Sequence, residues 1–532
     1  MVTRSGGREF HGAFYEYLRN NAMDANSWSR NQSTASNFTA PYKYNQYGYN
    51  ISGPVFIPKV FNKDREKLFF LFAQEWVKIR QESSTFQRVP SAAMRQGNFS
   101  ELLGTNLYYS GARTINDPQT GQPFPGNIIP ANRLSSNGMA FLRTYPEANG
   151  AFPSNNNFFQ VRPAPRDQRK DTYNIDYNPT QNQVIRFRHA NYAYVESNAF
   201  AGGFDFAPST LNRPNKTASI GHTWTLSPTM INEFLFAASN DRVTIGVLRT
   251  GRFQRSVNNI TYPYIFDNPK EIQDKIPTVV IPNVGTIDGG PYPASSSGPI
   301  YQLSNNFTKI AGKHTFKTGF YFERSGQNDF DQINVSGVPG GTNNQNGRFQ
   351  FNDVRPGGAP GTGTGLANAA LGLFSTYAEI GPRSFTPYRG HYVEFFGQDS
   401  WRVSQRLKLE LGFRGTFTNG YYKSLWGNIA YFDPAAYSSA NAAVLDRATG
   451  NVISGDRFNG VRIPGTEWPK AAIGRVPAAS DPQFNRLFDG GDAYPSPNQF
   501  NMMPRFGMAY SLNNKQVIRA GFGGFMARPG VY

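Results

Sequence analysis

The sequence predicts an all-β protein, an antiparallel up-and-down transmembrane β-barrel with long extracellular loops. Three observations lead to this fold class. Many short segments alternate apolar and polar side chains, as strands with two different faces do. Tight turns and long connections alternate along the chain. Nowhere does an apolar run approach the roughly 18 residues that a membrane-spanning helix requires.

The clearest predicted strand runs from Leu407 to Phe417. Its side chains point alternately to opposite faces, because successive residues of a strand do so. We therefore expect one face to contact lipid, with Leu409 near the middle of the bilayer, and the other to line the lumen. The lipid face would carry Leu407, Leu409, Leu411 and Phe413, and the lumenal face Lys408, Glu410 and Arg414.

About thirteen strands follow from the same pattern. They include residues 9–19, 42–51, 68–79, 172–178 and a strand from 183, and further strands flank the turns at 227–229, 311–313, 404–406 and 513–514. The strands at 172–178 and 183 are joined by Pro179-Thr180-Gln181-Asn182, where Pro and Asn favour a turn. The repeated unit is therefore a hairpin followed by a long polar connection.

The connections fall into two classes that alternate strictly. One class is mostly two to four residues long, with a longer member at 53–67, and the other comprises 20–41, 81–171, 198–213, 246–298, 329–389 and 421–503. An up-and-down barrel places short turns at the periplasmic rim and long loops outside. A soluble β-sandwich or propeller with insertions is the alternative, but its insertions would fall at either end of a sheet. The alternation favours the barrel.

Composition excludes several classes of function. Aromatic residues reach 15% while the mean hydropathy is −0.52, which suits strands that are apolar on one face only. The absence of cysteine excludes disulfides and thiolate chemistry. The net charge is +17, but the 53 Lys and Arg residues form no basic block, so we expect no nucleic-acid partner. The first residues lack a signal peptide, so the protein stays inside the cell or its true N-terminus is missing.

Candidate chemical sites are weak. The five histidines are isolated, so no metal site is expected, and His189, His314 and His391 are expected to line the lumen or the rim. Gly361–Gly365 lacks the Lys-Ser/Thr of a phosphate-binding loop and is interpreted as a flexible loop before a short amphipathic helix at 366–373. Residues 489–492 are interpreted as a turn rather than a calcium site. We predict no enzyme activity, no catalytic residue and no cofactor.

Four of the six tryptophans allow two interpretations each. Trp224 and Trp401 precede tight turns, which suits an aromatic girdle at a membrane boundary, although core packing is the alternative. Trp426 and Trp468, near Tyr421 and Tyr422, could stack on a sugar or pack their loop. No residue is assigned to substrate binding.

Several segments taken together resemble a known family. The junction at residues 2–6, 9–12 and 16–20 is similar to the plug-to-barrel junction of TonB-dependent receptors, specifically the Oar-like group. Further similar segments follow in the same order at 53–55, 67–70, 89–100, 117–121, 124–130, 396–403, 407–414, 504–507 and 517–523. The evidence for this resemblance is the order and spacing of all these segments together, because no single segment is diagnostic.

The resemblance implies that the chain is a fragment. Residues 1–7 would be the last strand of the plug and the plug-to-barrel junction, and residues 8–532 the N-terminal part of the barrel. Because transporters of this class have about 22 strands, the barrel would be incomplete at about 13 of 22. The family's signal peptide, its carboxypeptidase-regulatory-like β-sandwich and its TonB-contacting segment would be missing. We expect an incomplete curved sheet, open at 9–19 and at 516–528.

The resemblance also implies a function. It predicts a Gram-negative outer-membrane receptor, with lipid and the TonB complex as partners, that takes up a scarce solute by energy-coupled transport. A siderophore, an oligosaccharide, a peptide or a cobalamin-like solute would all fit, and the basic chain tips the choice only slightly toward an anionic one. The alternative is a surface adhesion or structural barrel without transport, since the loops greatly exceed the strands in length.

Overall fold

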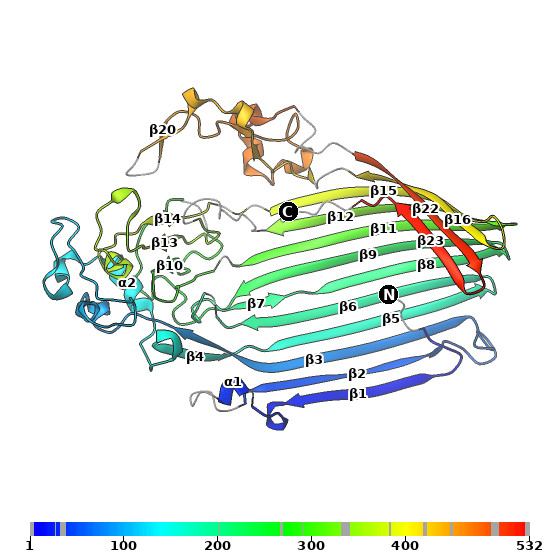
Figure 1. Ribbon diagram of the computed structural model, residues 1–532, viewed down its shortest axis with the longest axis horizontal. Helices are drawn as coiled ribbons and strands as arrows, with labels where there is room; N and C mark the ends of the chain where they lie inside the picture. The colour runs from blue at the N-terminus through cyan, green and yellow to red at the C-terminus, as the bar shows by residue number, and fades with distance from the viewer. Residues whose placement is uncertain are drawn as a thin grey trace.

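A computed structural model of the chain contains one antiparallel sheet of sixteen strands (Figure 1). The structure describes residues 5–26, 28–31, 39–200, 202–266, 270–290, 292–330, 341–381, 383, 385–418, 423–446, 451–490 and 499–526. Most of the predicted plug strand at residues 2–5, the predicted Tyr421 and Tyr422, Asp492 and the predicted open edge beyond residue 526 lie outside these ranges.

Thirteen long strands form the wall, as the sequence predicts. They are β1 (His11–Asn20), β2 (Tyr42–Pro54), β3 (Leu68–Gln87), β5 (Arg166–Thr180), β6 (Gln183–Asn198), β8 (Asn215–Ser227), β9 (Met230–Val247), β11 (Ala294–Ala311), β12 (His314–Phe330), β15 (Phe385–Arg402), β16 (Leu407–Thr418), β22 (Gln499–Asn513) and β23 (Gln516–Gly523).

Three short strands complete the sheet, namely β4 (Phe158–Pro163), β7 (Ser209–Asn212) and β17 (Lys423–Ser424). Small sheets in the loops contain β10 (Thr278–Val280), β13 (Arg348–Gln350), β14 (Thr376–Ala378), β18 (Tyr431–Phe432), β19 (Val444–Leu445), β20 (Val452–Ser454) and β21 (Val461–Arg462). The helices are α1 (Trp28–Asn31), α2 (Ser136–Thr144) and α3 (Gly365–Ala370), besides short 3-10 turns. None of the helices in the described part of the chain is long and apolar enough to cross a membrane.

The two classes of connection separate to opposite ends of the sheet. Short turns lie at one end of the strands and the long connections at the other (Figure 1). Between β11 and β12 the turn consists of only Gly312 and Lys313, and Gly312 has a φ of 57°. A left-handed backbone at this position suits the twist of a two-residue hairpin, and glycine adopts it without steric cost.

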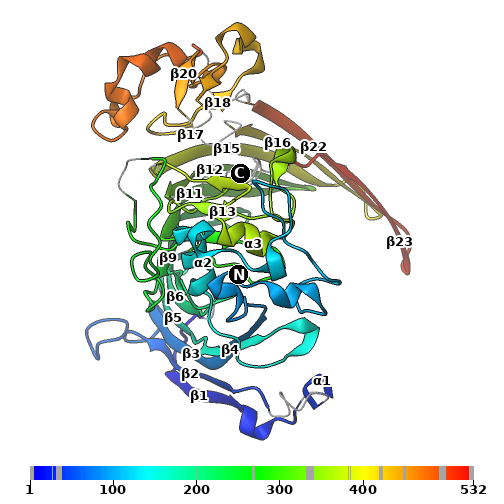
Figure 2. The ribbon, with the colours of Figure 1, turned by 90° about the vertical axis from the view of Figure 1, so that its left-hand side faces the viewer.

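The two faces of the wall have opposite chemistry. One unbroken row of paired residues crosses ten strands and is entirely apolar: Phe70, Ile175, Phe187, Ile220, Phe236, Leu303, Phe322, Val393, Phe417 and Phe500. The next row, one residue along each strand, includes Asn174, Arg188, Gln302, Glu323 and Thr418 on the opposite face. The sheet curves so that this polar face is concave (Figure 2).

Exposure confirms the predicted alternation of the strand β16 from Leu411 to Thr418, whereas the first residues, at the short-turn end, show no such contrast. Leu411, Phe413 and Phe417 on the convex face are 41%, 40% and 49% exposed, whereas Thr416 and Thr418 on the concave face are almost completely buried. From Leu407 to Phe417 the strand rises about 34 Å, which at a tilt of ~40° spans about 26 Å. That height matches the apolar band of about 25 Å that a membrane barrel presents to lipid.

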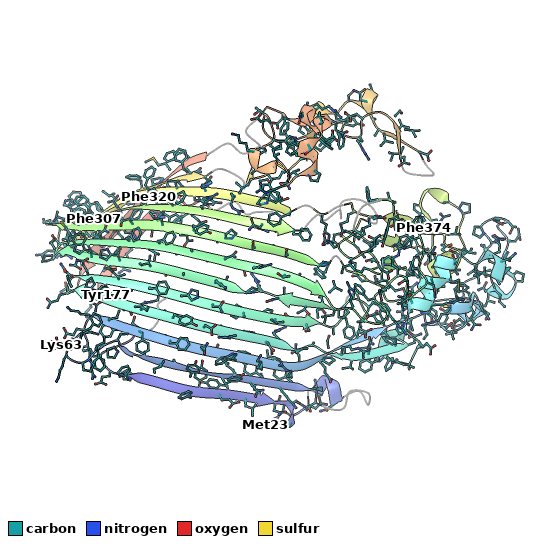
Figure 3. The ribbon with its side chains drawn as sticks, turned by 180° about the vertical axis from the view of Figure 1, so that it is seen from behind. Met23, Lys63, Tyr177, Phe307, Phe320 and Phe374 are labelled. Atoms are coloured by element: carbon teal, nitrogen blue, oxygen red, sulfur yellow. The ribbon has the colours of Figure 1, made fainter. Side chains whose placement is uncertain are left out.

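The convex face keeps this character toward the short turns. Tyr177, Phe307 and Phe320 lie toward that end of the strands, whereas Phe374 lies among the packed loops at the other end (Figure 3). Tyr177 and Phe320 are 36% and 41% exposed. Large exposed aromatic side chains on one whole face of a sheet are unfavourable in water and favourable against lipid.

Several strands are longer than the sequence predicts at the loop end. β3 continues from the predicted Ile79 to Gln87, and β15 begins at Phe385, before the predicted Arg389. The added segments have polar side chains on both faces, as in Glu82-Ser83-Ser84-Thr85, so periodicity gives no signal there. Backbone pairing with β4 defines the end of β3 instead.

The wall is open at both edges. Within the described residues, β1 pairs only with β2, and β23 pairs only with β22. Figure 2 shows the resulting incomplete curve. Ser5, at the start of the described chain, lies on its concave side, 3.2 Å from Arg188. The predicted open, curved sheet is confirmed.

The register yields a test of the lipid face. Leu409 pairs with Trp401, close to the short turn, so it lies near the rim and not at the middle of the bilayer as the sequence suggests. Phe413 lies nearer the middle. In the full-length protein, we expect Phe413→Arg to lower the free energy of unfolding by about 2–4 kcal/mol and Leu409→Arg to lower it by less. Denaturant titration in lipid vesicles measures both.

A spin-label pair provides the control for this assignment. A label at Phe413 should be relaxed by oxygen dissolved in the lipid, and a label at Lys317, on the concave face, by a water-soluble nickel chelate. Equal lipid accessibility at the two positions contradicts the assignment.

Candidate functional site

Four of the long connections fold together into one unit at the loop end of the wall, which we call the cap. It comprises the described residues of 88–165, 199–208, 248–293 and 341–381, and it lies on the concave side of the sheet (Figure 2). Its side chains form a continuous core in which Phe99, Phe141, Phe204 and Phe351 are 0–2% exposed. The sequence predicts that these long connections are polar. That prediction is wrong for the four cap segments, because together they bury an apolar core.

The helices α2 and α3 pack closely within the cap. A Cβ added to Gly138 of α2 would lie 1.9 Å from the carbonyl oxygen of Ala369 in α3, so only glycine permits this approach. Ser135 caps α2 through the N–H of Gly138, and Thr364 caps α3 through the N–H of Ala367. Ser and Thr are favoured at such positions because their oxygens accept unpaired helical N–H groups.

The Gly361–Gly365 segment is ordered within the cap, contrary to the flexible loop that its sequence suggests. Thr362 and Thr364 are completely buried, and the hydroxyl of Thr362 donates to Asn368 over 3.0 Å. A helix follows, as expected, but α3 begins at Gly365, the last residue of this segment, and it is buried on all sides and not amphipathic. The segment therefore serves as a helix cap.

A buried ion pair holds two of the cap segments together. Lys270 Nζ lies 2.5 Å from Glu379 Oε1, and neither side chain is exposed. Glu379 also accepts from the hydroxyl of Tyr377 (2.7 Å) and from the N–H groups of Ile265 (2.9 Å) and Phe266 (3.2 Å). These donors compensate for the cost of removing both charges from water.

Lys275 is a buried cation in the same unit. Its ammonium donates to the carbonyl oxygens of Gly290 (2.5 Å) and Tyr292 (3.0 Å). Burial lowers the pKa of Lys275 to about 7, and the nearby Arg383 lowers it further while Asp288 opposes the shift. Lys275 therefore lies close to its midpoint of protonation at neutral pH.

Below the cap, the concave wall carries a series of charged and hydrogen-bonding side chains. Arg188 lies 2.6 Å from Asp176, and Arg414 lies 2.5 Å from Glu394. Glu410 accepts from Gln398 over 2.8 Å. These groups face the lumen because successive side chains of a strand point to opposite faces, and the apolar residues beside them in sequence occupy the convex face.

A small groove lies on the concave face at β15, β16 and β22. Its volume is about 190 Å³, and Glu394, Arg414, Thr416 and Arg505 are among its lining residues. Among the described side chains, Arg414 Nε and Thr416 Oγ1 are buried without a hydrogen-bond partner. Buried polar groups are normally paired. These atoms therefore supply unused hydrogen-bonding capacity in the groove.

The histidines are distributed over the wall. His189 packs on Tyr173, and His391 lies near Phe322, both on the convex face at the loop side of the apolar row. These two lie at the rim rather than in the lumen. His314 lies at the short-turn rim, 2.7 Å from Asp399. No cluster of residues able to hold a metal ion occurs in the described ranges.

The tryptophans near the loop end pack against neighbouring rings. Trp426 contacts Phe385 at 5.1 Å between centroids, and Trp468 contacts Phe488 at 5.3 Å, so both serve loop packing. Trp224 is on the convex face, 39% exposed, where an aromatic girdle would lie. The sequence places Lys408, Glu410 and Arg414 on the lumenal face of their strand, but it identifies none of the polar lumenal residues as a binding site. The sequence feature that could identify these residues is their position between the apolar residues of a strand, which directs them to the face opposite the apolar one.

The wall, with an apolar convex face and a polar concave face, defines an antiparallel barrel-forming sheet of the outer-membrane type. The chain belongs to the outer membrane beta barrel domain family, whose model matches residues 2–532. The protein accordingly resides in the Gram-negative outer membrane, in contact with its lipid. No curated protein matches the chain.

Solved structures with a similar fold are distant. The outer membrane transporter YddB from Escherichia coli is 7% identical with a TM-score of 0.41; 98% of this chain and 52% of that chain are covered. The copper transporter OprC is 8% identical with a TM-score of 0.37, covering 98% and 45%. The siderophore receptor PirA from Pseudomonas aeruginosa is 8% identical with a TM-score of 0.31, covering 96% and 55%. The chain spans about half the length of these structures.

The buried pair Lys270–Glu379 yields a test of the cap. Glu379→Gln leaves the ammonium of Lys270 buried without its counter-charge, which should destabilise the cap by about 3–5 kcal/mol. We expect protease added to intact cells that display the full-length protein to cut within 88–165 much faster in this variant.

Asp456→Asn is the matched control for this test. It breaks a more exposed ion pair with Arg486 at 2.7 Å, outside the cap, and exposed pairs contribute at most about 1 kcal/mol. Equal cleavage of the two variants within 88–165 contradicts a cap held by the buried pair.

Lys275 yields a pH dependence. Its pKa is about 7 in the folded cap and about 10.4 in the unfolded chain, so the unfolded chain binds more protons between these values. The stability of the cap should therefore rise from pH 7 to about pH 10 and be lowest below pH 7. Hydrogen exchange of cap amides, corrected for intrinsic rates, measures this. Lys275→Gln should abolish the rise, and an unchanged rise in that variant contradicts the assignment.

Proposed function

We propose that the protein takes up a scarce solute through the outer membrane by energy-coupled, TonB-dependent transport. The observation that carries this proposal is the polar concave wall beneath a folded cap. A wall that serves only as a membrane anchor requires an apolar convex face but no series of charged groups facing inward. Such groups provide successive hydrogen-bonding contacts for a solute that moves along the lumen.

The groove at Arg414 indicates the chemistry of the solute. Arg414 presents a guanidinium with an unused Nε, and Thr416 presents a free hydroxyl. Arg505 also lines this groove. Two guanidinium groups and a hydroxyl suit a hydrogen-bonding solute with anionic or hydroxyl oxygens, because Arg donates to such oxygens in a planar fork. This inference agrees with the slight preference for an anionic solute that the net charge suggests.

Energy coupling is supported by the N-terminal segment. Ser5 Oγ lies 3.2 Å from Arg188 Nη2 on the concave wall, and Gly6 lies so close to β3 that a Cβ would be 2.4 Å from the carbonyl oxygen of Phe70. The segment that resembles a plug-to-barrel junction thus lies against the lumenal face. A plug joined there would occupy the lumen, and its displacement by the TonB complex would open the path.

A surface adhesion barrel remains the second candidate, and one observation favours it. The described residues of 423–490 form a loop unit beside β15, apart from the cap (Figures 1 and 2). Several of its apolar side chains are exposed, among them Phe432 at 58%, Ile453 at 64% and Ile473 at 59%. Scattered exposed apolar residues are common on proteins, so the wall chemistry is the stronger argument.

Uptake by cells that carry the full-length gene tests the proposal. Cells would be supplied with culture medium limited in turn for iron, carbohydrate and peptide nitrogen, and growth would be compared with and without TonB. The double variant Glu394→Gln/Arg414→Gln should raise the half-saturating solute concentration about tenfold, because it removes charge-assisted contacts worth about 1.4 kcal/mol.

The matched control is Lys309→Gln, on the convex face at the short-turn rim. It should leave uptake unchanged. Uptake that does not depend on TonB, or a protein that supports cell adhesion and no growth, contradicts the transport proposal and favours the adhesion barrel.

A further inference from the structure

Tyrosine side chains gather on the concave face of the wall near its N-terminal edge. Along each strand, every second residue from the row of Phe70 and Ile175 returns to the convex face, and the residues between them face the lumen. Five of the lumenal tyrosines lie close together on β1, β2 and β6, which belong to the lower part of the curve in Figure 2. We call these five the tyrosine platform: Tyr15, Tyr17, Tyr44, Tyr192 and Tyr194.

The tyrosine platform lies between the N-terminal segment and the cap. Ser5 contacts Arg188, which pairs with Asn174 of β5. The residues of β5 that lie beside the platform, from Lys170 to Arg166, are four to eight positions further toward the loops. The platform therefore begins about 14 Å along the strand from the row of Asn174, at 3.4 Å per residue. Arg166 directly follows a cap segment, so a solute that enters from the loop end would meet the platform before the N-terminal segment.

The ring of Tyr15 extends across the neighbouring strand β2. Its hydroxyl donates to Glu75 on β3 over 3.0 Å, although β2 lies between the two strands. Space for the ring exists because residue 48 of β2 is glycine: a Cβ on Gly48 would lie 2.7 Å from the hydroxyl oxygen of Tyr15. One face of the ring therefore covers the backbone of β2, and the opposite face is directed toward the lumen.

Amide and carboxylate groups hold the neighbouring rings in place. Tyr44 donates to Gln46 over 2.6 Å, and Gln46 donates in turn to Glu75 over 2.8 Å. On the other side of β3, Tyr192 donates to Gln168 over 3.1 Å. These groups accept from the tyrosine hydroxyls, and each amide or carboxylate has further donor or acceptor capacity beside an aromatic ring.

The charged groups of the tyrosine platform occur in pairs. Glu75 Oε1 lies 3.5 Å from Lys170 Nζ. Glu196, which also accepts from the hydroxyl of Tyr194, lies 2.5 Å from Arg166 Nη2. Because each carboxylate has a cation beside it, the platform presents rings, hydroxyls and amides and not a field of one sign. It differs in this respect from the groove at β15, β16 and β22, which two guanidinium groups line.

The tyrosine platform forms an extended surface with an aliphatic floor. Val77 and Ile79 of β3 lie between the two groups of tyrosines and are 7% and 8% exposed. From β1 to β6 there are four strand spacings, about 19 Å in all. Beyond β6 the row of Tyr192 continues over Asn215 and Asp241, which have no ring. The surface is thus bounded on this side and suits a chain of linked units better than one small molecule.

We propose that the tyrosine platform binds an oligosaccharide. A sugar ring has an apolar face of C–H groups that packs on an aromatic ring, and a rim of hydroxyls that each donate and accept a hydrogen bond. The tyrosine rings match the first property, and the adjacent amides and carboxylates match the second. A strongly anionic solute would instead require cations without acidic partners. This inference rests on the proposed transport function and names the class of its solute.

Binding to the full-length protein purified in detergent tests the proposal by calorimetry. The probes are linear hexasaccharides of glucose, xylose, mannose and galacturonic acid, the last because the groove at Arg414 suits a carboxylate. We expect at least one of them to bind. For this probe, Tyr15→Ala/Tyr192→Ala should raise the Kd about tenfold, because two aromatic stacking contacts are lost. Tyr15→Phe/Tyr192→Phe keeps both rings and should raise the Kd much less.

Tyr47→Ala/Tyr173→Ala is the matched control, because it removes two tyrosine rings from the convex face. It should leave the Kd unchanged. Binding of none of the four hexasaccharides overturns the proposal, and so does an equal Kd for the wild type and the double alanine variant of the platform. If that variant unfolds, Tyr17→Ala is the milder one, since Tyr17 is 61% exposed, and it should still weaken binding measurably.

The same measurement separates this proposal from the transport proposal. Binding in detergent requires neither TonB nor an energy source. TonB-dependent uptake of another solute by a protein that binds no hexasaccharide refutes the platform and leaves the transport proposal standing. Binding of a hexasaccharide whose uptake does not depend on TonB supports the platform and contradicts TonB-dependent transport.

Discussion

Backbone hydrogen bonding in the absence of water is the constraint on which the rest of this structure depends. Inside a bilayer, an unpaired N–H or C=O costs several kcal/mol, so a spanning strand must pair on both sides. The long antiparallel ladders from β1 to β23 meet this requirement for the eleven strands between the two edges. Once the ladder is fixed, the period of two decides which side chains contact lipid and which contact the lumen.

That period is why the wall could be predicted from sequence. Phe413 and Phe417 alternate with Arg414 and Thr416, and the register of β16 leaves no other assignment of faces. The short turns could be predicted because glycine, proline and asparagine have specific backbone preferences. Strand ends at the loop side could not, since segments such as Glu82–Thr85 are polar on both faces and are defined by pairing alone.

The cap could not be predicted because its contacts join segments far apart in sequence. For example, the hydroxyl of Tyr109 donates to Asp353 over 2.8 Å, although the two residues are 244 positions apart in the sequence. No local sequence pattern around either residue predicts this contact. The Gly-rich stretch at 361–365 illustrates the difficulty, since its glycines permit many conformations and only burial of Thr362 and Thr364 selects one. The candidate site shares this limit. The sequence shows that its polar side chains alternate with apolar ones along each strand. It does not show that they converge on one groove, because that convergence depends on the curvature of the sheet.

The separation of the cap segments along the chain also has a consequence for assembly. Contacts between distant residues form slowly, because the entropy of closing the intervening chain opposes them until other structure has brought their ends together. In this protein, the strands β3 to β15 bring the ends of the four cap segments to one rim. The cap core should therefore be the last part to form, after the strands have paired in the membrane. Until the wall is in place, the large aromatic side chains of this core, such as Phe99, Phe141 and Phe204, would be exposed to water, where they favour aggregation.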